Sequence, residues 1–118
     1  MNNPIWHYAK EEGMRCYRKD GTPYGDMEEW AKDFERFPEV RRVPETTLPD
    51  GKLVSTIWLG VDYSFGSGPP LIFETMVFLS HGDWAELDMM RYSTESEALE
   101  GHGVMVKRWG GSDGLAEV

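Results

Sequence analysis

Two stretches of the chain repeat apolar residues at intervals of three and four, which places them on one face of an α-helix. The first stretch is 26–37, with Met27, Trp30, Ala31, Phe34 and Phe37. The second is 94–109, in which Ala98, Met105 and Trp109 share their face with His102. Asp26 precedes Glu29 by three residues, a spacing that caps a helix N-terminus reciprocally, and Thr94 precedes Glu97 in the same way. We therefore expect two amphipathic helices with buried apolar faces.

Four other segments are rich in β-branched and aromatic residues, which favours strands. They cover 40–48, 52–62, 71–79 and 84–92. Pro44 has no N–H to donate, so the first strand should lie at a sheet edge or contain a bulge. Short connections, such as Pro49-Asp50-Gly51, favour a meander. The expected fold is α+β, a mainly antiparallel sheet of about four strands packed by two amphipathic helices.

Two further segments complete the expected domain. Residues 14–24 predict a small hairpin that turns at Asp20-Gly21. Residues 1–109 should form a single domain, followed by a glycine-rich flexible tail over 110–118.

The predicted strands carry more apolar surface than the two helices would cover. Assigning faces by alternation along each strand gives a second apolar face that is more than one helix would cover. Its apolar residues are Val54, Trp58, Ile72, Met76 and Phe78. Something must close such a face, and the candidates are the N-terminal segment or a second copy of the chain. A homodimer is therefore one expected arrangement.

The composition fits one globular domain. The chain has 118 residues, of which 40% are hydrophobic and 28% are charged. No apolar run approaches the roughly 18 residues of a membrane span, and the N-terminus does not resemble a signal peptide. A single cysteine, Cys16, excludes an internal disulfide and favours a reducing compartment. We expect a cytoplasmic protein without membrane contact.

The charge is unevenly distributed along the chain. Residues 1–52 carry nine basic and eleven acidic side chains, whereas residues 53–106 carry one basic side chain, Arg91, and eight acidic ones. The negative electrostatic field of residues 53–106 repels phosphate backbones, so direct nucleic-acid binding is disfavoured. The same field attracts basic patches on partner proteins. The same charge also serves solubility.

The loop 63–70 is the most distinctive candidate for ligand binding. The N–H groups of Gly66 and Gly68 could cradle an anion, while Tyr63 and Phe65 could stack on a base. The Lys-Ser/Thr pair of a phosphate-binding P-loop is missing, and prolines stand where its helix would begin. We favour a rigid connection between two strands.

Two carboxylates are candidates for chemistry. Asp62 and Glu74 are expected on the same face of adjacent strands near Trp58, and a buried glutamate needs a partner or a raised pKa. Glu74 could then act as an acid or base. Structural pairing is favoured, and the possible partners are Arg41, Arg42 and Arg91.

The remaining reactive side chains give no catalytic or metal-binding pattern. His81 lies beside Asp83 in a predicted turn, and His102 lies on a buried helical face where core packing is favoured. Cys16 has no histidine at a recognisable spacing. We expect no metal and no cofactor.

The central run Thr46 to Phe78, TTLPDGKLVSTIWLGVDYSFGSGPPLIFETMVF, followed by Arg91-Tyr92-Ser93-Thr94-Glu95 and Gly101-His102, resembles a family of small uncharacterised proteins found in bacteriophages and prophages. The resemblance covers about residues 14–108. It implies a genomic context: an accessory phage product of the kind that acts on the host cell or on its antiviral defences. No catalytic residue comes with it.

The leading hypothesis is a non-enzymatic accessory protein that binds a host protein through an acidic and aromatic surface, in the cytoplasm of the host cell. The aromatic anchors expected there are Trp58, Tyr63, Phe65 and Trp84. The alternative is a nucleotide-binding protein that uses the loop 63–70 with Arg41 and Arg42 at a subunit interface. The candidate binding residues are Trp58, Asp62, Tyr63, Phe65, Gly66, Gly68, Glu74, His81, Arg41 and Arg42.

Overall fold

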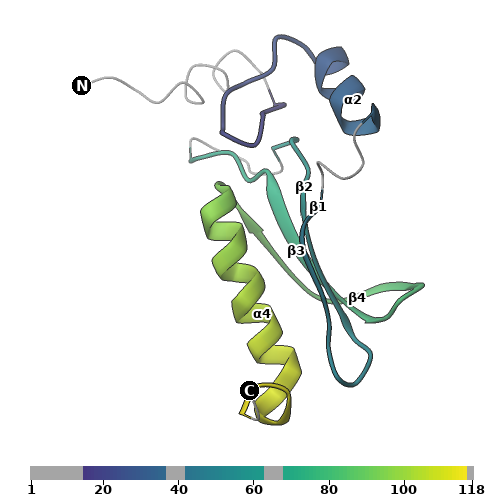
Figure 1. Ribbon diagram of the computed structural model, residues 1–118. Helices are drawn as coiled ribbons and strands as arrows, with labels where there is room; N and C mark the ends of the chain where they lie inside the picture. The colour runs from purple at the N-terminus through teal and green to yellow at the C-terminus, as the bar shows by residue number, and fades with distance from the viewer. Residues whose placement is uncertain (1–14, 37–41, 63–67, 117–118) are drawn as a thin grey trace.

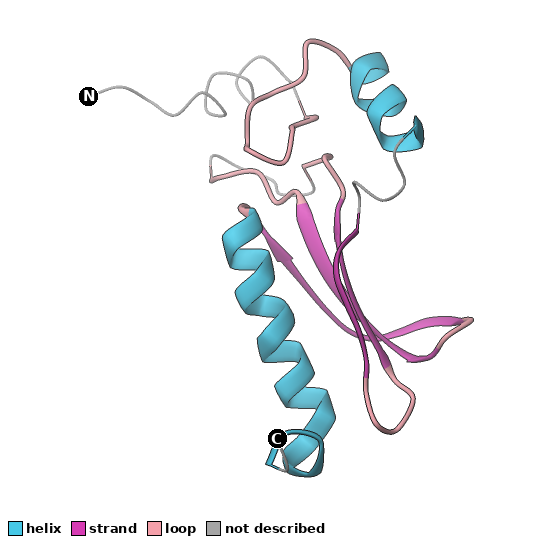
Figure 2. Cartoon of the chain, in the orientation of Figure 1, coloured by secondary structure: helices cyan, strands magenta, loops and turns pink. Residues whose placement is uncertain are grey.

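The computed structural model describes residues 15–36, 42–62 and 68–116. Its elements are α2 (Met27–Arg36), β1 (Arg42–Thr47), β2 (Leu53–Trp58), β3 (Phe73–Ser80), β4 (Asp83–Tyr92) and α4 (Glu95–Ala116). The four strands form one antiparallel sheet in the order β1-β2-β3-β4 (Figures 1 and 2). The expected α+β fold and the meander are both confirmed.

Helix α4 runs along one face of the sheet (Figure 1). It begins with the expected capping pair, in which the Glu97 N–H donates to Thr94 Oγ1 at 3.1 Å and the Thr94 N–H donates to Glu97 Oε1 at 3.1 Å. Ala98 and Met105 on its inner side are fully buried, against different parts of the sheet. The apolar face predicted for this helix therefore forms core with the sheet.

Helix α2 lies beyond one end of the sheet (Figure 1). Trp30 and Phe34 pack against the cluster around Trp58, and the Trp30 indole donates to the carbonyl of Leu59 at 3.0 Å. Gly60, with a φ of +76°, lets this indole approach the backbone. Met27 is 61% exposed, so its expected burial is wrong.

The N-terminal end of α2 is capped as the sequence predicts. The Glu29 N–H donates to Asp26 Oδ1 at 2.9 Å, and the Gly25 N–H donates to Glu29 Oε2 at 3.0 Å. The predicted hairpin before this helix is also present, reduced to one isolated bridge, between Tyr17 and Pro23, around a turn at Gly21, which has a φ of +92°.

The end of α4 differs from the expectation. The helix does not end near Trp109 but continues to Ala116, so most of the expected flexible tail is helical. No proline interrupts this stretch, and a glycine costs a helix only about 1 kcal/mol relative to alanine. Gly110 also lies close to the side chain of Leu48, which places the helix against the β1–β2 turn.

The pairing of β2 with β3 overturns the expected assignment of faces. Val54 lies opposite Val77, and Leu53 lies opposite Phe78, so even-numbered residues of β2 share a face with odd-numbered residues of β3. The group expected on one face is therefore divided between two. The face under α4 carries Val54, Thr56, Trp58, Phe73, Thr75 and Val77.

Bulges interrupt both outer strands. The register of β1 shifts between Arg42 and Glu45, which confirms the bulge or edge position predicted from Pro44. In β4 the register shifts after the pair of Val77 with Asp88, so that Phe78 then pairs with Glu86. A second shift follows between Phe78 and Ser80, which pairs with Asp83, and bulges of this kind bend their strand.

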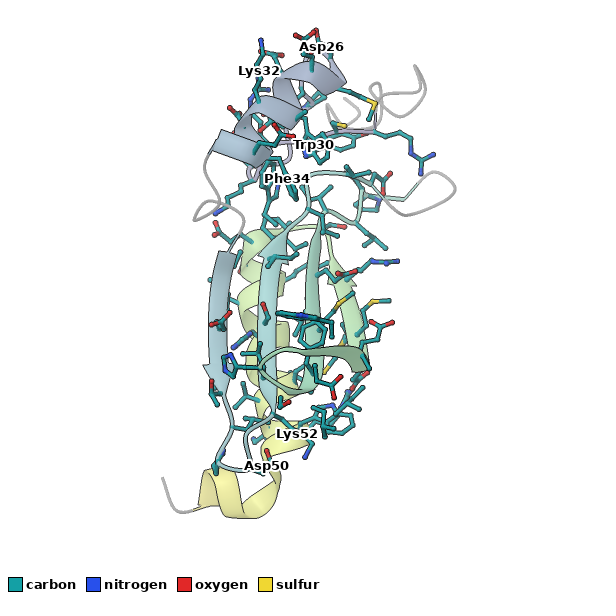
Figure 3. The ribbon with its side chains drawn as sticks, turned by 90° about the vertical axis from the view of Figure 1, so that its right-hand side faces the viewer. Asp26, Trp30, Lys32, Phe34, Asp50 and Lys52 are labelled. Atoms are coloured by element: carbon teal, nitrogen blue, oxygen red, sulfur yellow. The ribbon has the colours of Figure 1, made fainter. Side chains whose placement is uncertain are left out.

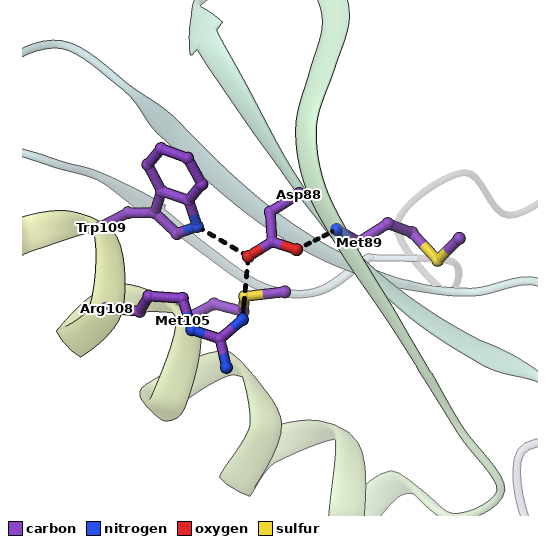
Figure 4. Close-up of polar contacts among 5 residues, drawn as sticks. All are labelled: Asp88, Met89, Met105, Arg108 and Trp109. Carbon is purple, nitrogen blue, oxygen red and sulfur yellow. Dashed lines mark hydrogen bonds and ion pairs between the residues drawn. The ribbon is translucent and has the colours of Figure 1, made fainter.

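Asp88 ties α4 to the outer strand β4 (Figure 4). Its Oδ2 accepts from Trp109 Nε1 and from Arg108 Nη1, both at 2.9 Å, while Oδ1 accepts from the Met89 N–H at 2.8 Å. The Trp109 indole N–H and then the Arg108 guanidinium lower the pKa of Asp88. The carboxylate thus satisfies a backbone donor of an edge strand, which helps to prevent pairing with foreign strands.

Candidate interaction site

The sheet face opposite α4, called the open face here, is covered by no helix of the described residues. Figure 3 views the sheet from this side, with α4 behind it. Strand register places the following residues on it: Leu53, Ser55, Ile57, Glu74, Met76, Phe78, Glu86, Met89 and Arg91. The sequence predicted an apolar face that the helices do not cover, and the described part of the chain has such a face. The residues on it differ from those expected.

A pocket lies on the open face beneath Trp84 and is called the Trp84 pocket. Its volume is about 210 Å³, and its lining residues are Ser55, Ile57, Glu74, Met76, Phe78 and Trp84. The Trp84 ring meets the Phe78 ring edge to face, with centroids 5.3 Å apart, and yet Trp84 remains 70% exposed. An exposed aromatic ring therefore forms one wall of a mostly apolar hollow.

Two register shifts in β4 accompany the position of Trp84 on this face. One separates the pair of Val77 with Asp88 from the pair of Phe78 with Glu86, and the other separates Phe78 with Glu86 from Ser80 with Asp83. Alternation along β4 therefore does not fix the side of Trp84, and the contact of its ring with Phe78 places it at the pocket. Sequence analysis named Trp84 as an exposed aromatic residue but missed the pocket, because alternation in residues 84–92 gives no sign of these shifts.

Glu74 forms the polar part of the pocket wall. Its side chain is 6% exposed, and Glu74 Oε2 accepts from Arg91 Nε at 2.9 Å. Structural pairing was the favoured interpretation, and the structure shows Arg91, one of the three candidates, in contact with Glu74. The expected position near Trp58 is wrong, because Glu74 pairs with Ile57 and faces the opposite side.

Two other candidates belong to the interior. Trp58 is 1% exposed and its indole donates to the carbonyl of Tyr17 at 3.2 Å, so its expected role as an exposed anchor is wrong. Asp62 is 2% exposed, and its Oδ1 accepts from the Leu71 N–H at 2.9 Å. This carboxylate thereby fixes the two ends of the 63–70 loop.

Among the other described candidates, neither His81 nor Gly68 lines the pocket. His81 is exposed in the β3–β4 turn, where its Nε2 lies 2.8 Å from Thr47 Oγ1. Gly68 is also exposed. Four candidates, Arg41, Tyr63, Phe65 and Gly66, lie outside the described residues, and only the backbone of Arg42, in β1, is described. The nucleotide hypothesis rests on these and stays a prediction.

His102 lies within a buried group of hydroxyls between α4 and the sheet. Its Nδ1 is 2.8 Å from Thr56 Oγ1 and its Nε2 is 2.8 Å from Thr46 Oγ1. Thr56 Oγ1 in turn lies 2.5 Å from Thr75 Oγ1. The favoured interpretation, core packing, is confirmed, and burial lowers the pKa of His102.

Acidification should therefore weaken the fold through His102. Because the folded state lowers the pKa of His102 below its ordinary value of 6.5, the unfolded state binds a proton first, and stability falls as pH drops below about 6.5. Replacing it by His102→Gln should flatten the pH dependence of the unfolding free energy between pH 7.5 and 5.5 by up to about 1.4 kcal/mol per pH unit. Urea unfolding across this range measures the slope.

The exposed His81 supplies the control for this experiment. His81→Gln makes the same substitution at an exposed histidine of the β3–β4 turn and controls for the change of residue type. Equal slopes for His102→Gln and wild type would contradict the role of burial.

Comparisons with known proteins add no further constraint. No family model matches the chain, and neither the curated proteins nor the solved structures contain a match. Within the described ranges, no three side chains of the metal-binding types come together, and no helix there is long and apolar enough to cross a membrane.

Proposed function

We propose that this protein is a non-enzymatic binding protein that attaches to a host protein through the open face of its sheet. The observation that carries the proposal is the Trp84 pocket, in which a largely exposed tryptophan stands over an apolar hollow. Exposed apolar surface of this kind is typical of interaction sites, and tryptophan is among the residues that dominate binding energies.

The acidic second half of the chain supports a basic partner. Eight acidic residues and one basic residue fall between residues 53 and 106. Long-range attraction of a basic surface raises association rates and weakens as salt is added. A nucleic-acid-binding protein of the host, including a factor of its antiviral defence, has such a surface and is the partner class that the resemblance to phage proteins favours.

A capture experiment with matched variants tests the proposal. The immobilised protein is exposed to bacterial lysate at low salt as wild type, as Trp84→Ser and as Leu99→Ser. Leu99 is the control because it is 52% exposed on α4, the helix on the other side of the sheet. Trp84→Ser should weaken capture of a specific protein by at least about thirtyfold, the equivalent of a 2 kcal/mol anchor, whereas Leu99→Ser should keep it.

Two results would overturn the proposal. One is equal capture by wild type and Trp84→Ser, or no specific capture by either. The other is a wild-type dimer in sedimentation equilibrium that Trp84→Ser, but not Leu99→Ser, converts to a monomer. The second result would assign the open face to a second copy of the chain.

A further inference from the structure

We infer, building on the proposed function, that the Trp84 pocket recognises one apolar side chain of the partner that lies next to a basic residue. The occupant is an aromatic or large aliphatic group inside the pocket, with a lysine or arginine beside it at the rim. The open face then recognises a short motif of the partner, one apolar residue next to one basic residue, rather than a broad basic surface.

The size of the pocket fits one side chain. Its volume is about 210 Å³. An apolar cavity of about 150 Å³ holds benzene in an engineered protein, so this pocket has room for a phenyl or an indole ring. Ile57, Met76 and Phe78 supply apolar contacts on the sheet, and Trp84 supplies a ring for stacking.

The charges around the pocket favour a cation beside that ring. Glu74 lines the pocket, Glu86 lies opposite Phe78 on β4, and Glu45 lies opposite Ser55 on β1. Among the described side chains of the open face, Arg91 is the single cation, and it is already paired with Glu74. Glu86 adds a carboxylate beside this ion pair, and residues 53–106, which supply β2, β3 and β4, carry eight acidic side chains and one basic one. The resulting negative potential attracts a cation and repels an anion.

The same charges disfavour a second copy of the chain as the occupant. Each copy carries a net charge of −9, and a symmetric contact would bring two acidic open faces together. Like charges placed against each other across an interface cost binding energy. A basic partner has no such cost, so we assign the pocket to it.

Three probes of one shape test the inference: tryptamine, 3-methylindole and indole-3-acetate, which share the ring and differ in charge. In ¹⁵N- and ¹³C-methyl-edited NMR titrations of the full chain, tryptamine should shift the signals of Ile57, Met76 and Trp84. It should bind about threefold or more tightly than 3-methylindole, as one or two exposed ion pairs would give, and indole-3-acetate should bind weakest. Trp84→Ala should abolish these shifts, and Leu99→Ala should preserve them.

The charge part of the inference has its own variants. The double variant Glu45→Gln/Glu86→Gln should remove the preference for tryptamine over 3-methylindole. Its matched control is Glu95→Gln/Glu100→Gln, which neutralises two exposed carboxylates on α4 and should leave the preference unchanged. Equal binding of tryptamine and indole-3-acetate would overturn the charge preference, and shifts that do not depend on Trp84 would overturn the pocket.

These outcomes separate the inference from the proposed function. If Trp84→Ser abolishes capture from lysate but no indole probe binds, the open face is an interaction site and only the assignment of its occupant fails. If the probes bind as described but capture does not depend on Trp84, the pocket is real and the proposed function fails.

Discussion

Gly101→Ala should lower the free energy of unfolding by about 1–3 kcal/mol, the range expected for an overpacked contact. Gly101 is buried in α4 at the point where the helix crosses Tyr92, and a methyl group there would overlap Cε1, Cζ and the hydroxyl of the tyrosine ring. The ring is buried too, so it has little room to withdraw. The helix must move away from the sheet, and packing along the interface weakens. Chemical denaturation of wild type and variant measures the loss.

Gly103→Ala supplies the control in the same helix, two residues away. Gly103 is exposed, and a methyl group added there meets nothing within 4 Å. Alanine is a better helix former than glycine, so this change should stabilise the protein by about 0.5–1 kcal/mol. The two glycine-to-alanine substitutions should thus change the free energy of unfolding in opposite directions. A stabilising Gly101→Ala would show that α4 does not lie against Tyr92 in this way.

The sequence predicted those features that depend on neighbouring residues. The two helix starts were predicted correctly because the capping side chains bond to N–H groups within four residues, as Asp26 and Thr94 do. The bulge or edge position of the first strand followed from Pro44, because proline lacks the N–H that a ladder needs. These effects require no knowledge of the rest of the fold.

Features that depend on distant parts of the chain were not predictable in this way. The pairing of Val54 with Val77 is set across the long connection between β2 and β3, whose length does not determine register. A shift by one residue would exchange the two faces, and the sequence pattern is apolar on both. The register shifts in β4 are equally hidden, because the alternation of apolar and acidic residues continues unbroken through Leu87.

The candidate site shows the same division. Glu74 and Trp84 were both singled out by residue type, but their meeting in one pocket depends on the register of β3 and on the bulge in β4. Trp58 was assigned to the surface because nothing in its own strand distinguishes its side from the other. Residue chemistry therefore identified the candidates, and tertiary pairing decided which of them share a site.

Trp58→Ala should cost about 3–5 kcal/mol, the usual loss for a large aromatic side chain removed from a core. Trp58 is 1% exposed and packs with Tyr24, Phe34 and the rest of the cluster around it, so the alanine leaves a cavity between the sheet and α2. It also removes the donor to the carbonyl of Tyr17. Equilibrium denaturation monitored by far-UV circular dichroism measures the change.

Trp84→Ala is the matched comparison, since it removes the same ring from the open face. Trp84 is 70% exposed and its main described contact is the edge-to-face pair with Phe78, so the cost should be about 1 kcal/mol. If the faces followed the even-numbered pattern along the chain, Trp58 would lie on the open face and its loss would be as mild as that of Trp84. A difference of about 2 kcal/mol or more between the two variants therefore tests the register of β2 and β3 directly. Equal and small losses of unfolding free energy in the two variants would mean that Trp58 lies at the surface. The residues assigned to the open face would then be wrong, and the pocket would have no structural basis.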